Sequence, residues 1–140
     1  MKRDDRIYTA ALVDGEGSVT LTKHQGNEHR FPGLTVPSTT YVFMAFLKRT
    51  FGGHISTKKR YKKTYSKSWV WAVRTDRALR VLSAIVPFMK EPEKVRRINL
   101  LLKYYKKVTP RNGKYTAKLL KEKKKFESRF FLGSRKVMGV

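Results

Sequence analysis

The segment that decides the fold is Thr9-Ala10-Ala11-Leu12-Val13-Asp14-Gly15-Glu16-Gly17-Ser18-Val19. Small and apolar side chains fill its first half, and with the residues before them they predict a helix that Asp4 or Asp5 caps. The two glycines within residues 14–17 permit backbone angles that other residues resist, so the helix is expected to stop there. Residues 18–23 then alternate polar and apolar side chains, which predicts a strand with one buried face.

The same spacing rules predict the remaining elements. In chain order these are a second strand that ends near residue 36, a helix that Gly52 and Gly53 stop, strands over residues 54–61 and 68–75, and helices that start near residues 76, 92 and 115. Asp76 is the expected cap of the first of these late helices, and Pro92 suits the first turn of the next. Trp69 and Trp71 alternate with Val73, which predicts sheet core, although tryptophans of this kind can also stack on unpaired bases.

This order of elements defines the α+β fold class. We expect an αββαββα core in which a four-stranded antiparallel sheet carries helices on one face, followed by C-terminal helices. The expected domain organisation is a core over residues 1–108 and a basic helical extension of the same domain over residues 109–140.

Composition restricts the function. The chain has 140 residues, and 33 Lys and Arg against 10 Asp and Glu give a formal net charge of +23. Such a charge indicates a polyanionic partner, because it makes an isolated compact chain repel itself. Without any cysteine, disulfides, thiolate zinc sites and cysteine nucleophiles are excluded. No membrane span or signal peptide is recognisable, so we expect an intracellular protein that does not bind membranes.

The uncovered face of the predicted sheet is the candidate nucleic-acid surface, because a ribbon of hydrogen-bonding and cationic side chains fits the major groove of duplex DNA. Together with the neighbouring turns, its candidate DNA-binding residues are Thr20, Thr22, His24, His29, Thr35, Ser56, Lys58, Arg60, Lys62, Lys63 and Arg74. The alternative is an ordinary solvated face. The lysine run at residues 121–125 has the same two interpretations, phosphate contact or solvated helix face. The three histidines lack metal-ligand spacing, so zinc is not expected.

Residues 9–17, followed by Ser18 and Val19, resemble the signature of the LAGLIDADG homing endonucleases in the variant that ends Asp-Gly-Glu-Gly-Ser. The single copy of this motif, the two hairpins, Phe51-Gly52-Gly53 and the later segment Ile98-Asn99-Leu100-Leu101-Leu102-Lys103 are also similar to the small single-motif members. The resemblance covers residues 5–107.

The resemblance implies a homodimer in which the signature helices pack at the dimer axis through Tyr8, Ala10, Ala11 and Leu12. It implies that Glu16 is the catalytic and metal-binding carboxylate, with the Gly15 carbonyl as a second ligand of Mg²⁺, or of Mn²⁺ in its place. Lys103 corresponds to a lysine near the scissile phosphate. Ser38 stands where the family often has a glutamine that positions water, and it is equally suited to cap a helix. Without the resemblance, Glu16 reads as a solvated turn residue.

The resulting hypothesis is a metal-dependent, site-specific homing endonuclease that makes double-strand breaks in a long pseudo-palindromic DNA target. A first alternative is a non-cleaving binding protein on the same scaffold, either an intron RNA maturase or a DNA-binding regulator. A second is an unrelated basic RNA-binding or ribosome-associated protein.

Overall fold

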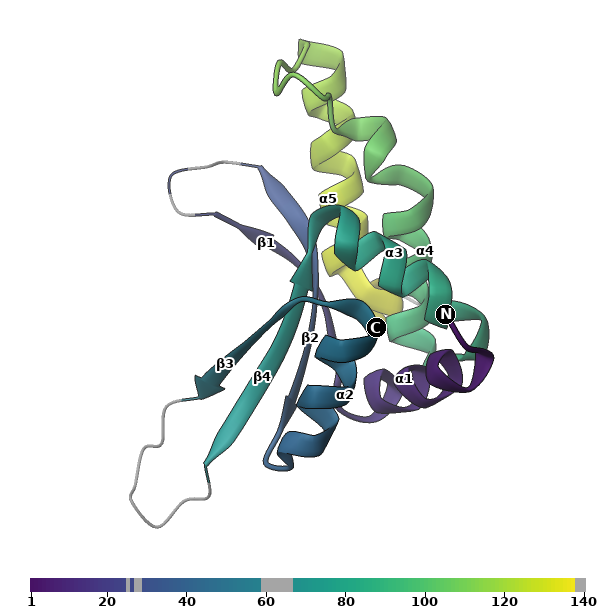
Figure 1. The fold of residues 1–140 in the computed structure, drawn as a ribbon. Helices are drawn as coiled ribbons and strands as arrows, with labels where there is room; N and C mark the ends of the chain where they lie inside the picture. The colour runs from purple at the N-terminus through teal and green to yellow at the C-terminus, as the bar shows by residue number, and fades with distance from the viewer. Residues whose placement is uncertain (25, 27–28, 59–66, 138–140) are drawn as a thin grey trace. The chain divides into compact units, whose positions relative to one another are not determined.

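A computed structural model describes residues 1–24, 26, 29–58 and 67–137 of the chain, with side chains as far as residue 132 (Figure 1). Its internal contacts divide the chain into the units Met1–Lys90 and Glu91–Val140, and each unit is described by itself. The core domain predicted over residues 1–108 extends past this division, and its organisation as one domain stays a prediction.

The N-terminal unit has the predicted αββαββα order. Its elements are α1 (Arg3–Glu16), β1 (Ser18–Lys23), β2 (Arg30–Ser38), α2 (Tyr41–Phe51), β3 (His54–Lys58), β4 (Ser68–Arg74), α3 (Thr75–Ile85) and the 3-10 turn η1 (Val86–Phe88). All neighbouring strands are antiparallel, and the order β1-β2-β4-β3 places the second strand of each hairpin in the middle of the sheet. The predicted α+β fold class is therefore confirmed.

Helices α1, α2 and α3 cover one face of this sheet (Figure 1). The strands bury Val19, Leu21, Leu34, Val36, Trp71 and Val73 against them. Burial of each large apolar side chain among them stabilises the fold by about 1.5–3 kcal/mol. Trp71 is completely buried, and its indole N–H donates to the Gly52 carbonyl at 2.8 Å. The sequence-based assignment of Trp71 to the core is confirmed.

The predicted N-cap residues of α1 and α3 are wrong, because the structure places other residues at these positions. Lys2 and Arg74 occupy the N-cap positions of α1 and α3, and neither side chain makes a capping hydrogen bond. Asp4, Asp5 and Asp76 lie inside the first helical turns instead. Carboxylates in a first turn still stabilise a helix, because they face the positive end of its dipole.

The end of α2 confirms the role predicted for Gly52 and Gly53. Their φ angles are +76° and +92°, in the region that favours glycine. A Cβ atom at Gly53 would also lie 2.7 Å from the Ala72 carbonyl oxygen. The double glycine therefore stops α2 and lets β3 approach β4 closely.

The C-terminal unit consists of α4 (Pro92–Tyr104), the 3-10 turn η2 (Lys106–Val108) and α5 (Ala117–Val137). Pro92 begins α4 as predicted. Arg96 connects the two helices, because its guanidinium pairs with Glu93 and donates to the Phe130 carbonyl at 2.8 Å. Within the described part of the chain, no helix is long and apolar enough to cross a membrane.

Candidate active site and nucleic-acid interface

The face of the sheet opposite α1, α2 and α3 is set by the strand register, because directly paired residues share a face. This open face carries Ser18, Thr20, Thr22, Phe31, Gly33, Thr35, Pro37, His54, Ser56, Lys58, Ser68, Val70, Ala72 and Arg74. Thr20, Thr22, Thr35, Ser56, Lys58 and Arg74 had been predicted to share it, and this placement is confirmed; their contact with DNA stays a prediction. The face is less uniformly polar than expected, because Phe31, Val70 and Ala72 lie among the hydrogen-bonding groups.

One end of the open face is basic. Arg74 Nη1 lies 3.3 Å from His24 Nε2, and the His24 ring lies 5.0 Å from the ring of Phe31. His24 directly follows β1, and its contacts with Arg74 and Phe31, both on the open face, place it on the same side of the sheet. His29 is half-buried in the bend before β2. The remaining candidates of this surface, Arg60, Lys62 and Lys63, lie outside the described residues.

Glu16 is the last residue of α1, and its side chain is exposed. The residue that follows, Gly17, has an extended backbone with φ −77°, which any residue can adopt, so backbone strain does not explain the glycine. A Cβ atom at Gly17 would lie 2.8 Å from Val13 Cα, which shows that glycine allows the chain to pass close behind the helix. This sharp exit connects Glu16 within two residues to Ser18, the first residue of the open face.

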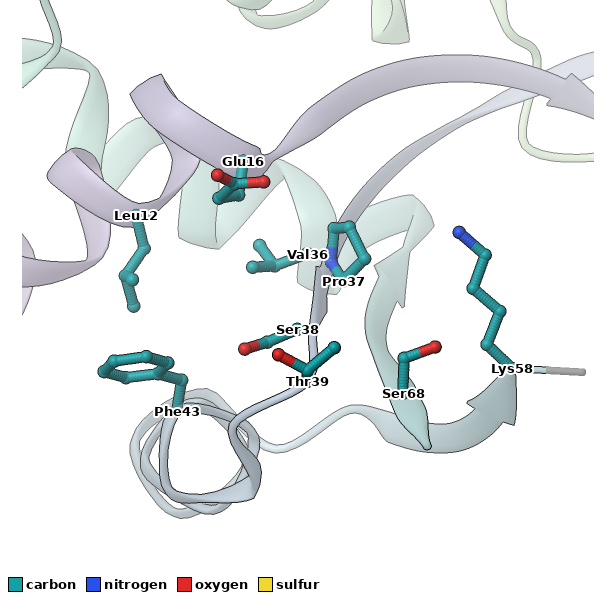
Figure 2. A pocket seen from close by; sticks show the side chains of 9 residues that line it. All are labelled: Leu12, Glu16, Val36, Pro37, Ser38, Thr39, Phe43, Lys58 and Ser68. Carbon is teal, nitrogen blue, oxygen red and sulfur yellow. The ribbon is translucent and has the colours of Figure 1, made fainter. Parts of the chain in front are cut away.

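A hollow of about 470 Å³ lies beside Glu16 (Figure 2). It is lined by Leu12, Glu16, Val36, Pro37, Ser38, Thr39, Phe43, Lys58 and Ser68. The hollow thus brings together two residues that the sequence assigns to the active site, Glu16 and Ser38, and one that it assigns to the DNA-binding surface, Lys58. Ser38 Oγ accepts a hydrogen bond from the Thr40 backbone N–H at 2.9 Å, so its hydroxyl closes a local turn. Thr40, and not Ser38, occupies the N-cap position of α2.

The other carboxylate near this end of α1 is already engaged. Asp14 accepts hydrogen bonds from the Lys90 backbone N–H at 3.0 and 3.2 Å. This contact, which also holds Lys90 near the end of α1, could not be found from the sequence because 76 residues separate the partners. Glu16 is therefore the carboxylate that this helix end presents outward.

The chemistry of this helix end suits a hard divalent cation. The last turn of α1 contains no basic residue, and the carbonyls at a helix C-terminus carry partial negative charge. A carboxylate together with backbone carbonyl oxygen atoms is the donor set that Mg²⁺ prefers. Among the described residues there is no group of three or more His, Asp or Glu side chains that could hold a metal. By the chemistry of their oxygen donors alone, the Glu16 carboxylate and the Gly15 carbonyl would fit as part of a coordination shell.

The predicted dimer-interface residues divide between two faces of α1. Ala10 is only 1 % exposed and packs within its own core, so its assignment to the interface is wrong. Tyr8 and Ala11 are exposed and Leu12 is half-buried, which leaves a stripe of three residues at helical spacing along the surface. The Tyr8 ring packs edge-on against Phe46, with 5.1 Å between the ring centroids.

Lys103 lies on α4, in the C-terminal unit, where its ammonium is 5.3 Å from the centroid of the Tyr104 ring. Its predicted role near a scissile phosphate stays a prediction. In the lysine run of α5, Lys121, Lys124 and Lys125 are exposed. Lys123 is buried, so it is neither a solvated nor a phosphate-contacting residue. It donates to Thr109 Oγ1 at 2.6 Å, and burial lowers its pKa to about 8.

This fold is that of the LAGLIDADG homing endonucleases. The homing endonuclease I-CvuI, solved with the I-CreI target in the presence of magnesium with the DNA not cleaved, is 18 % identical, with a TM-score of 0.64 over 91 % of this chain and 85 % of its own. I-GzeII in complex with its DNA target is 20 % identical, with a TM-score of 0.62 over 94 % of this chain and 47 % of its own. I-SmaMI bound to cleaved DNA is 19 % identical, with a TM-score of 0.61 over 91 % of this chain and 44 % of its own.

At these identities the likeness establishes the fold. No family model matches the sequence, and no curated protein matches it at the sequence level. The chain spans most of I-CvuI but about half the length of I-GzeII and I-SmaMI.

Proposed function

We propose that this protein is a site-specific DNA endonuclease that depends on a divalent metal ion and cuts both strands of a long pseudo-palindromic target as a homodimer. The observation that carries this proposal is the exposed Glu16 carboxylate, which ends α1 two residues before the open face of the sheet begins. Acidic side chains are uncommon in this chain, which has 10 Asp and Glu against 33 Lys and Arg. One that is presented outward beside a basic surface indicates a role in binding a cation.

Duplex DNA is the partner that suits the open face. Threonine and serine hydroxyls can donate to or accept from base edges, and Arg74 can pair with guanine in the major groove. The similar structures I-CvuI, I-GzeII and I-SmaMI were solved with DNA, which supports the same class of ligand for this fold. Neutralisation of phosphates by so many cations predicts an affinity that falls steeply with salt.

For cleavage, Glu16 and the Gly15 carbonyl would hold Mg²⁺, or Mn²⁺ in its place. When bound, such an ion activates a water molecule and stabilises the leaving oxygen of the phosphodiester. Lys58, which lines the same hollow, would bind the DNA backbone with its ammonium group (Figure 2). Asp14 keeps its structural contact with Lys90, which holds the end of α1 in place.

Two copies are needed because each chain supplies one such carboxylate. The stripe formed by Tyr8, Ala11 and Leu12 is the surface that we assign to the contact between copies, since Tyr8 and Leu12 offer apolar area to bury and the small side chain of Ala11 allows a second helix to approach closely. The lengths of the similar proteins support this assignment. The fold occupies most of I-CvuI but only about half of I-GzeII, as expected if the longer chain contains two such units.

The test is cleavage of a supercoiled plasmid. Its insert consists of the two DNA sequences that flank the gene, joined directly to each other. The wild type should linearise it with Mg²⁺ and not with EDTA. Glu16→Gln should keep DNA binding but cut at least about a hundredfold more slowly, a barrier increase of roughly 3 kcal/mol. The matched control is Glu122→Gln, which removes an exposed carboxylate on α5 and should cut like the wild type. Undiminished cleavage by Glu16→Gln would refute the assignment.

A non-cleaving binding protein on the same scaffold is the second candidate. It is favoured by one observation, the hydrogen bond that the Ser38 hydroxyl accepts within its own turn. A short side chain engaged in this way is poorly suited to position a water molecule. This candidate predicts tight binding of duplex DNA or of intron RNA, with no cutting in either Mg²⁺ or Mn²⁺.

A further inference from the structure

Three cationic side chains of the C-terminal unit gather around one tyrosine ring. The Lys103 ammonium lies 5.3 Å from the centroid of the Tyr104 ring, the Lys107 ammonium 5.9 Å and the Arg129 guanidinium 5.2 Å. Lys103 and Lys107 come from α4 and the turn after it, whereas Arg129 comes from α5. All three side chains are exposed to solvent.

These charges are not balanced by acidic neighbours. In the described part of the chain, no carboxylate forms an ion pair with Lys103, Lys107 or Arg129, whereas Glu93 serves Arg96 and Arg97. The ring face attracts the cations through its electron density, which offsets part of their mutual repulsion. An anion bound between them would relieve the repulsion that remains.

The Tyr104 hydroxyl also takes part. Hydrogen bonds to this oxygen from Arg129 and then Lys103 lower the pKa of the phenol. A phenol that accepts from two cations still has its own O–H to donate. The cluster therefore presents charged N–H donors from two helices and one hydroxyl donor, and the planar guanidinium matches two oxygen atoms of a phosphate group.

We propose that Tyr104, Lys103, Lys107 and Arg129 form a phosphate-binding site that takes a backbone phosphate of duplex DNA. The choice of duplex DNA rests on the proposed function. This role for Lys103 is distinct from one at the reacting phosphate, because it contributes to affinity and to the salt dependence of binding.

The experiment measures the dissociation constant for the target duplex over a series of KCl concentrations. Each lost phosphate contact should reduce the slope of log Kd against log[KCl] by about 0.9. The double variant Lys107→Gln with Arg129→Gln, which removes the single phosphate contact of this site, should therefore lower the slope by about 0.9. The control, Lys114→Gln with Lys118→Gln, removes the same charge from exposed positions of the same unit and should lower it by less than half as much. Equal changes in the two variants would overturn the site.

Two further readouts separate this proposal from others. Inorganic phosphate alone should raise the pKa of Tyr104, measured as the phenolate absorbance of the wild type minus that of Tyr104→Phe, and no shift would contradict a phosphate site. If phosphate shifts the tyrosine but the duplex does not bind, the assignment to DNA fails together with the proposed function. A Lys103→Gln variant that cuts slowly at saturating DNA with an unchanged salt slope would move Lys103 to the reacting phosphate and remove it from this site.

Discussion

The open face of the sheet and the lysine run of α5 are both basic. Composition alone therefore makes both of them candidates for contact with nucleic acid. The structure separates them. On the open face, Lys58 and Arg74 are exposed beside hydroxyl groups and lie on the same surface as the turn that presents Glu16. In α5, the ammonium of Lys123 is buried, 4.5 Å from the centroid of the Tyr105 ring and bonded to Thr109. A lysine in a charge run can therefore serve stability at one position and binding at another, depending on its burial.

The largest expected effect concerns Lys123 and the pH dependence of stability. Its pKa is about 8 in the folded state and near 10.5 when unfolded, so the unfolded chain holds more protons between these values. The free energy of unfolding should therefore rise as the pH increases through this window, by about 1–3 kcal/mol relative to Lys123→Met. Urea denaturation at a series of pH values measures this difference.

The control for this titration is Lys124→Gln, an exposed change on the same helix. Its stability profile should run parallel to that of the wild type. If the profile of Lys123→Met is also parallel, the Lys123 ammonium is not buried in solution and the contrast between the two surfaces disappears.

A smaller effect is expected for Arg74→Ala on the open face. Loss of a base or phosphate contact should weaken binding to the target duplex about tenfold. Stability should change by no more than about 0.5 kcal/mol, because the side chain is exposed. Fluorescence anisotropy at fixed salt measures the affinity, with Arg49→Ala on α2 as the charge-matched control. Equal losses of affinity for the two variants would show that the open face contributes only bulk charge.

Most of the fold could be predicted from local signals. The period of two residues in β1 and β4 assigned Val19, Leu21 and Trp71 to the core, and the double glycine marked the end of α2. These signals depend on neighbours within a few residues, so the sequence carries them directly. The same locality explains why the sequence predicts that the seven described candidates of the open face, His24 included, share one surface.

Several features that the sequence does not reveal depend on contacts between distant segments. Burial of Lys123 depends on Thr109 and Tyr105, which flank η2 and lie outside α5. Engagement of Asp14 depends on Lys90. The misassignment of Ala10 arose from its position in the helix, since small residues suit both a core and an interface. None of these contacts leaves a periodic signal.

The most direct measurement uses assemblies that contain one wild-type copy and one Glu16→Gln copy, isolated through different affinity tags on the two chains. If two copies of Glu16 make one cleavage site, these mixed assemblies bind the target duplex normally and produce no linear plasmid in Mg²⁺. Wild-type assemblies at the same concentration should linearise it. Linearisation by the mixed assemblies at the wild-type rate would contradict the shared site, because a single Glu16 would then be sufficient to cut both strands.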